Sequence, residues 1–162
     1  DIGGNSGEFA LRICRSHPGV AATVFDLPLV CEIGARHVRA EPEAGRLAFV
    51  PGDALRDALP GGFDLVCFKS MLHDWPEAEA KQLMARAAGS LRSGGTMLVF
   101  ERGALALRGT PIPFALVPLL LFYHSFRLPR FYADYLSELG FQNVQVRQID
   151  LEMPFHLVTG TR

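Results

Sequence analysis

The chain has 162 residues, of which 49% are hydrophobic and 20% are charged, and its formal net charge is -1. This length suits one domain with a proper core, and a near-neutral chain without a basic block argues against a nucleic-acid partner. No signal peptide is visible, and the longest apolar stretch, 111–123, is too short and too broken by proline to span a bilayer, so no membrane partner is expected.

Strand-like and helix-like periods alternate along the chain, which predicts an α/β fold with a mostly parallel sheet and helices on both faces. The first helix is expected from Ser6 to about His17, with Asn5 as its cap and Glu8 reaching back to it. The later elements are expected as strands at 21–25, 47–51, 63–69 and 96–100, helices at 29–38, within 75–92 and at 131–139, and a C-terminal antiparallel hairpin of strands at 143–149 and 155–160.

Two parts of the chain depart from this alternation. A strand should lead into Asp1, so we expect the first strand to be cut partway and the chain to be the C-terminal portion of something longer. The segment 103–127 is an apolar insertion rich in Pro, Leu and Phe. Either it packs on a domain or subunit outside this chain, or it walls an apolar pocket, and the two interpretations are compatible.

Candidate site residues follow the predicted strands. Ligands of open α/β sheets bind beyond the carboxyl ends of the strands. The glycines of the first seven residues let the backbone turn sharply and approach a ligand, and a carboxylate after the next strand can accept hydrogen bonds from ribose hydroxyls. This pattern favours an adenosine-containing cofactor. The residues at or just past strand ends are Gly3, Asp26, Asp53, Lys69 and Glu101, and His73 follows in the loop before a helix.

Each candidate also has a structural interpretation. Asp26 can be an ordinary turn aspartate, and Asp53 can cap a short helical turn. Asp74 is expected to be a helix N-cap, because Pro76 and Glu77 follow it in the pattern of a first turn. Trp75 is expected to serve packing. The histidines without any spacing signal, expected at the surface or in packing, are His17, His37, His124 and His156.

The cysteines and the other potential metal ligands point to no metal centre. Cys14, Cys31 and Cys67 are odd in number and lie in apolar or helical contexts, so we expect reduced core residues of a cytoplasmic protein. No pair of His, Cys or carboxylate residues has the spacing of metal ligands, and no structural metal is predicted.

Taken together, these motifs resemble the cofactor-binding domain of S-adenosylmethionine-dependent O-methyltransferases of the plant caffeate/flavonoid type and their bacterial secondary-metabolite relatives. The resemblance runs over essentially the whole chain. Its segments are the glycine motif Asp1-Ile2-Gly3-Gly4-Asn5-Ser6-Gly7, the ribose motif Phe25-Asp26-Leu27-Pro28, Gly52-Asp53-Ala54, Leu72-His73-Asp74-Trp75 and Leu98-Val99-Phe100-Glu101.

The resemblance implies a Rossmann-like class I methyltransferase fold with a seven-stranded sheet. It also implies that S-adenosylmethionine binds at Gly3, Asp26, Leu27, Asp53, Ala54 and Lys69 and leaves as S-adenosylhomocysteine. His73 would be the general base and Glu101 the residue that orients it. The acceptor would be a hydroxyl of a small, aromatic or apolar metabolite, against a wall of Phe114, Leu116, Leu120, Phe122 and Tyr123.

Three departures from the family pattern stand out. Asn5 replaces a third glycine, and Phe126 stands where plant members often carry a second base-flanking glutamate. The family's N-terminal dimerisation domain is absent from the chain; the resemblance implies a homodimer for the full-length protein.

Two other function classes remain open at this point. The first is an S-adenosylmethionine-binding domain without methyl-transfer activity, used as a scaffold or for other chemistry. The second is a nicotinamide-dependent oxidoreductase. Gly3, Gly4 and Gly7 do not fit the Gly-x-Gly-x-x-Gly pattern of dinucleotide sites, and the His-Asp-Trp segment has no place there.

Overall fold

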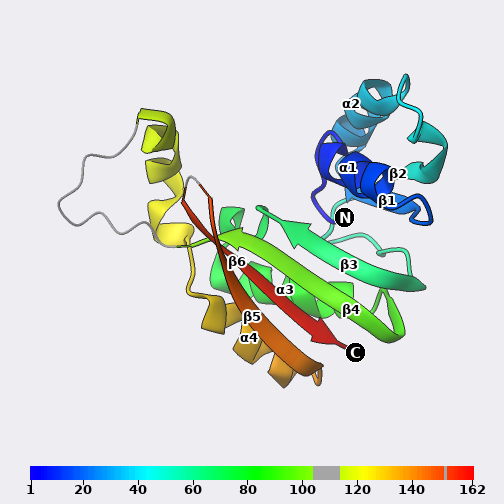
Figure 1. Ribbon diagram of the computed structural model, residues 1–162. Helices are drawn as coiled ribbons and strands as arrows, with labels where there is room; N and C mark the ends of the chain where they lie inside the picture. The colour runs from blue at the N-terminus through cyan, green and yellow to red at the C-terminus, as the bar shows by residue number, and fades with distance from the viewer. Residues whose placement is uncertain (104–113, 152) are drawn as a thin grey trace.

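The fold is known from a computed structural model, which describes residues 1–103, 114–151 and 153–162 (Figure 1). Its helices are α1 (Glu8–Ser16), α2 (Pro28–Val38), α3 (Glu77–Ala88) and α4 (Pro129–Glu138). Its strands are β1 (Ala22–Asp26), β2 (Leu47–Pro51), β3 (Phe63–Lys69), β4 (Leu91–Arg102), β5 (Gln142–Asp150) and β6 (Pro154–Thr161). Three 3-10 segments are η1 (Ala44–Arg46), η2 (Leu72–Asp74) and η3 (Phe114–Ser125).

The strands form two sheets. β1 and β2 pair in parallel, and a 4-stranded sheet has the order β3-β4-β6-β5. In that sheet β3 and β4 are parallel, and β6 pairs antiparallel with both β4 and β5, as the predicted hairpin requires. The two sheets are visible on the right and in the centre of Figure 1.

The first residues of the chain lie between the two sheets. Ile2 forms an isolated parallel bridge with Phe25 of β1, and its N–H donates to the carbonyl of Cys67 in β3 at 3.0 Å. One bridged residue is too short to be a strand. The described residues therefore form 6 strands in two sheets, where the resemblance implied one seven-stranded sheet.

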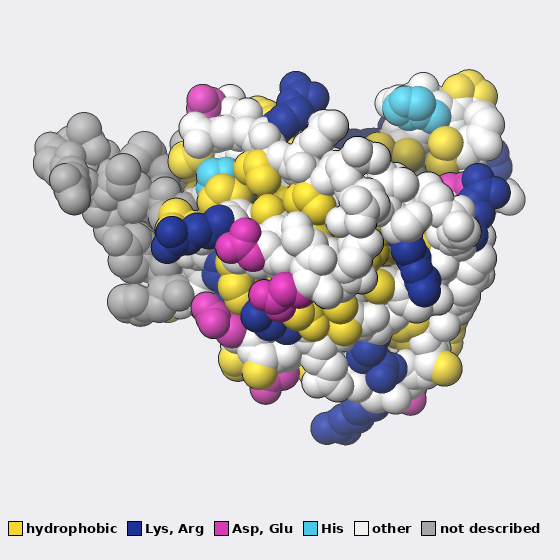
Figure 2. Space-filling view, turned by 90° about the horizontal axis from the view of Figure 1, so that it is seen from below, with side chains coloured by type: hydrophobic (Ala, Val, Ile, Leu, Met, Phe, Trp, Pro, Cys, Tyr) yellow, Lys and Arg dark blue, Asp and Glu magenta, His cyan; other side chains and the backbone are white. Residues whose placement is uncertain are grey.

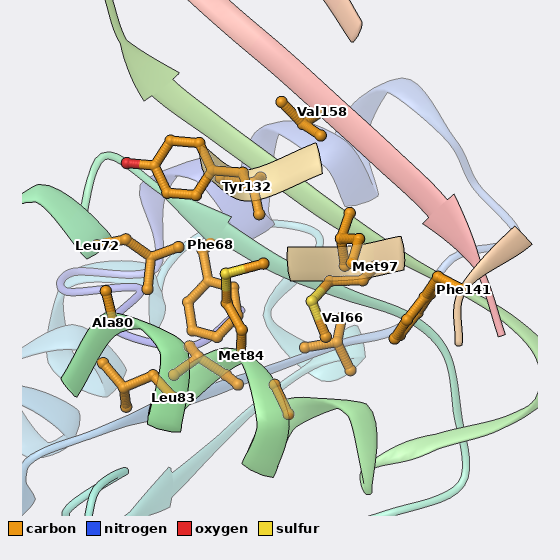
Figure 3. Packing of buried hydrophobic residues seen from close by; sticks show 14 of the residues in the cluster. Val66, Phe68, Leu72, Ala80, Leu83, Met84, Met97, Tyr132, Phe141 and Val158 are labelled. Atoms are coloured by element: carbon orange, nitrogen blue, oxygen red, sulfur yellow. The ribbon is translucent and has the colours of Figure 1, made fainter. Parts of the chain in front are cut away.

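The main core lies between the 4-stranded sheet and the two helices α3 and α4, which cover one of its faces (Figure 3). α1 and α2 pack against β1 and β2. The helix predicted within 75–92 is confirmed as α3, whose buried residues are Ala80, Leu83, Met84 and Ala87. They meet Val66 and Phe68 of β3, Met97 and Val99 of β4, and Tyr132 and Leu136 of α4.

Both predicted helix caps are wrong. Asn5 has a φ of 51° because the chain turns there to bring its N–H to Asp26, and the residue that caps α1 is Gly7, with a φ of 76°. Glu8 pairs with Arg12 in the next turn instead of reaching back. Asp74 lies inside η2, so α3 begins after Pro76 without a side-chain cap.

β4 is longer than the strand expected at 96–100. It begins at Leu91, with Gly89 and Ser90 between it and the end of α3, and runs through Gly94 and Gly95. Gly94 has a φ of 75°, and its N–H donates to the carbonyl of Arg162 at 2.8 Å. The pairing of β3 with β4 shifts register between Leu91 and Thr96, so the glycines let β4 bend where this ladder is irregular.

Other sequence predictions concern the cysteines and the surface. Cys14, Cys31 and Cys67 are buried free thiols, and burial raises the pKa of Cys31 and Cys67.

Within the described ranges, no helix has both the length and the apolar character that a bilayer span needs. On the face in Figure 2, basic and acidic side chains are dispersed among uncharged ones. A cavity of about 490 Å³ lies between β1 and β3, with Val20, Thr23, Leu59, Phe63 and Leu65 among its lining residues.

Candidate active site

The sequence-predicted site residues gather at one rim of the molecule, the carboxyl ends of the parallel strands. Asp26 is the last residue of β1, Lys69 is the last residue of β3, and Glu101 is the next to last residue of β4. Asp53 follows the end of β2 by two residues, and His73 lies in η2 directly after β3. This is the edge at which open α/β sheets bind ligands.

The glycine turn and Asp26 are joined by hydrogen bonds. Gly3 has a φ of 67°, and its N–H donates to the carbonyl of Phe25 at 2.9 Å. The Asp26 carboxylate accepts from the N–H of Asn5 at 2.8 Å and from the N–H of Leu27 at 2.7 Å. The carboxylate is thereby fixed at the start of α2, beside the exposed side chain of Leu27. A fixed acceptor of this kind suits a ribose diol.

Asp53 and Ala54 form a second part of the rim. Asp53 Oδ1 accepts from the N–H of Leu55 at 2.9 Å, so the side chain closes a local turn as one of its structural interpretations predicted. The Ala54 carbonyl accepts from Arg86 Nε of α3 at 2.7 Å, which fastens this turn to the helix. Lys69 Nζ lies 5.9 Å from the centre of the Phe9 ring, in the first turn of α1 after the glycine turn.

His73 and Glu101 form the centre of the site. Glu101 is fully buried, and His73 is 6% exposed. Glu101 Oε1 accepts from the N–H groups of Met71 at 2.8 Å and Leu72 at 2.6 Å, and Glu101 Oε2 lies 2.7 Å from His73 Nδ1. A carboxylate that accepts from these N–H groups favours a hydrogen on Nδ1, and a neutral ring held in this way keeps its lone pair on Nε2. The pair presents Nε2 as a proton acceptor.

Three further side chains lie against the His73 ring, and one of them, Asp74, was expected elsewhere, as a helix N-cap. Asp74 Oδ1 lies 3.3 Å from Nε2, and its side chain is half exposed. Phe122 meets the imidazole edge to face at 5.5 Å between ring centres, and Phe126 lies tilted at 5.4 Å. The carboxylate beside Nε2 therefore comes from the neighbouring residue in the chain, while an apolar ring occupies position 126.

The expected apolar wall is described in part. Residues 104–113 lie outside the described ranges, as do the side chains of Leu116 and Tyr123. Phe114 is 91% exposed, and Leu120 and Phe122 are more than a third exposed. Phe122 is the member of this wall that contacts the His73 ring.

Metal chemistry has no donor set in the part of the chain that the structure describes. No group of three or more His, Cys, Asp or Glu residues there could hold an ion. The polar groups of the rim include the carboxylates of Asp26 and Asp53 and the imidazole of His73.

Comparison with known proteins places this geometry in a family. A profile described as "O-methyltransferase domain" matches residues 1–142. Acetylserotonin O-methyltransferase of Bos taurus is 36% identical over 155 residues, which are 91% of this chain and 43% of that protein. The 3-hydroxy-5-methyl-1-naphthoate 3-O-methyltransferase of Streptomyces sahachiroi is 38% identical over 101 residues, which are 62% of this chain and 29% of that protein.

Solved structures agree with these relatives. Human N-acetylserotonin methyltransferase, solved in complex with S-adenosylmethionine, has a TM-score of 0.78 and 27% identity, and the match covers 100% of this chain and 46% of that one. The apo S-adenosylmethionine-dependent methyltransferase SibL has a TM-score of 0.85 and 25% identity, with coverage of 100% and 49%. The chain spans about half the length of these solved structures and less than half the length of the two curated relatives. The resemblance read from the motifs is thus confirmed: the chain belongs to the O-methyltransferase domain family, whose members use S-adenosylmethionine.

Proposed function

We propose that this site transfers a methyl group from S-adenosylmethionine to a hydroxyl of a small aromatic acceptor, with His73 as the general base. The observation that carries the proposal is the contact of His73 Nδ1 with the buried carboxylate of Glu101 at 2.7 Å. It fixes the ring and leaves Nε2 to take the hydroxyl proton. A base of this kind typically contributes roughly 10²–10⁴-fold to a rate.

The rim supplies the rest of the site. The cofactor fits with its ribose hydroxyls on Asp26, its adenosine beside Leu27 and the Asp53–Ala54 turn, and its chain along the Gly3 turn and Lys69. When bound, the cofactor supplies an activated methyl group. The protein's own task is to align the acceptor oxygen with that methyl and to remove the proton. Asp74, beside Nε2, would stabilise the imidazolium that results.

An aromatic acceptor is supported by the surroundings of the base. The Phe122 ring contacts His73 and is 38% exposed, so it offers an apolar surface next to the reacting atoms. Relatives are named for acetylserotonin and for a hydroxynaphthoate, and one solved family member of Planctomyces limnophilus was crystallised with apigenin. All three are aromatic hydroxyl compounds.

His73→Ala tests the proposal. Methyl transfer from radiolabelled S-adenosylmethionine to N-acetylserotonin and to apigenin should fall by roughly 10²–10⁴-fold. The affinity for S-adenosylhomocysteine, measured by titration calorimetry, should stay nearly unchanged. His17→Ala, at an exposed histidine that follows the C-terminal end of α1, is the matched control.

The outcomes separate the candidate functions. Unchanged turnover in His73→Ala would remove the imidazole from the mechanism. Tight S-adenosylhomocysteine binding with no transfer to any hydroxyl acceptor in the wild-type protein would favour the alternative of a binding domain without activity. Stabilisation by NAD in place of S-adenosylmethionine in a thermal shift assay would favour an oxidoreductase.

A further inference from the structure

The turn that carries His73 is held from two sides. η2 is a short 3-10 segment, and its N-terminal N–H groups at Met71 and Leu72 are bound by Glu101. The carbonyl groups of this segment are bound by a positively charged side chain. Arg127 donates from one guanidinium nitrogen to the carbonyl of Leu72 at 2.9 Å and from the other to the carbonyl of Trp75. The two carbonyls bracket His73.

Arg127 is itself fixed in place. Its guanidinium stacks on the ring of Phe131 in the first turn of α4, at 5.0 Å from the ring centre. The preceding residue, Phe126, is 7% exposed and lies against the His73 ring. The neighbouring Tyr132 is fully buried with its hydroxyl pointing out of the apolar cluster (Figure 3), and burial, together with the Glu101 charge, raises the pKa of Tyr132. Arg127, which precedes α4 by two residues, therefore reaches η2 with its guanidinium packed on a residue of that helix.

The geometry requires an arginine. A planar guanidinium can donate to two carbonyls at once and stack on an aromatic ring, whereas a lysine ammonium is a single point charge on a flexible stem. Charge-assisted bonds from partly buried groups are among the stronger hydrogen bonds in proteins. Together with the contacts of Glu101, these hydrogen bonds leave the imidazole ring little freedom to move.

We propose that Arg127 is a positioning residue for His73: by clamping the carbonyls of Leu72 and Trp75, it sets the direction in which Nε2 points. This inference rests on the proposed function for its effect on rate, but the clamp itself can be observed without turnover. In this proposal Arg127 acts on the imidazole through the backbone of η2.

Arg127→Met tests the clamp, with Arg127→Lys as the conservative variant and Arg130→Met, at the exposed arginine three residues on, as the control. We expect kcat to fall roughly 10- to 100-fold in Arg127→Met, because a small misplacement of a reacting group has costs of that size. Arg127→Lys should recover only part of this loss. The affinity for S-adenosylhomocysteine should be unchanged in all three.

A double-mutant cycle separates positioning from general support of the fold. If Arg127 acts through His73, adding Arg127→Met to His73→Ala should lower the remaining rate by less than about twofold. A second full loss of rate in that background would overturn the proposal, because the arginine would then act independently of the imidazole.

A spectroscopic readout decides the matter even without methyl transfer. The ring ¹⁵N and ¹H resonances of His73 report which nitrogen carries the hydrogen and how strong its bond to Glu101 is. We expect them to shift in Arg127→Met and to stay in place in Arg130→Met. Unshifted resonances in a folded Arg127→Met protein would overturn the clamp; shifted resonances without any wild-type turnover would uphold it and reject the proposed function instead.

Discussion

His73 shows how far single residues can be read from a sequence. The resemblance of the His-Asp-Trp segment and of Leu98–Glu101 to family motifs implied that Glu101 orients His73, and the two side chains lie 2.7 Å apart. Asp74 was assigned to a helix cap, because Pro76 and Glu77 after it form a first-turn pattern. The 3-10 turn instead directs its carboxylate to within 3.3 Å of His73 Nε2. The same local sequence fits both a helix N-cap and a contact with His73, and only the 3-10 turn decides between these two roles.

Glu101→Gln tests the assignment of the two ring nitrogens. The amide oxygen of Gln can still accept from Met71 and Leu72, but its NH₂ then faces His73 Nδ1 and donates to it. The imidazole must carry its hydrogen on Nε2, where it can no longer accept a proton. Methyl transfer should fall by roughly 10²–10⁴-fold while thermal unfolding stays cooperative.

Glu138→Gln is the control for this change. Glu138 is an exposed carboxylate at the end of α4, 3.9 Å from Lys81, and exposed pairs contribute little to stability. Its variant should keep full activity. An active Glu101→Gln protein would show that the carboxylate does not select the tautomer of His73.

At the scale of elements, the strands were easier to predict than the ends of the helices. The run 63–69 was predicted with the bounds of β3, and 21–25 differs from β1 by one residue at each end. Such strands are continuous apolar runs, which leave few alternatives. Helix ends depend on contacts that are distant in sequence. Asn5 does not cap α1 because its N–H is engaged by Asp26, 21 residues away.

The glycine turn before α1 makes an element-scale prediction. A Cβ at Gly3 would lie 2.5 Å from Met71 Cγ, and its φ of 67° is in the left-handed region. Gly3→Ala should therefore lower the free energy of unfolding by about 1–3 kcal/mol, measured by urea denaturation. It should also weaken S-adenosylhomocysteine binding, because the turn lines the proposed cofactor site.

Gly19→Ala is the matched control for the turn. Nothing lies within 4 Å of a Cβ added at Gly19, so its effect should stay within about 0.5 kcal/mol. Equal urea midpoints for the two variants would mean that Met71 yields and that the turn does not need its left-handed residue.

At the scale of the whole molecule, the order of the strands was beyond the sequence. Alternating periods predict a parallel sheet, but the pairing of β4 with β6 places Glu101 directly opposite His156. His156 was expected at the surface or in packing, and it is 8% exposed, so the packing interpretation holds. Glu101 and His156 are 55 positions apart in the sequence, so no local pattern predicts their contact. The register of the sheet brings them together.

This buried histidine predicts how the stability of the molecule depends on pH. Burial lowers the pKa of His156 below its usual value, so the unfolded chain binds a proton more readily than the folded one. The stability that follows from its neutral state is fully present above the unfolded pKa of about 6.5 and is lost as the pH falls through the folded value. The Tm should therefore decline from about pH 6.5 downward, before most carboxylates titrate.

His156→Asn should flatten this decline, because the amide does not titrate, even if the variant has a lower Tm throughout. The comparison is of slopes, from thermal melts of wild type and variant between about pH 7 and pH 5. His17→Asn serves as the control, since His17 is exposed and lies at the end of α1. A variant with an unaltered slope would show that His156 binds its proton equally well in the folded and in the unfolded chain.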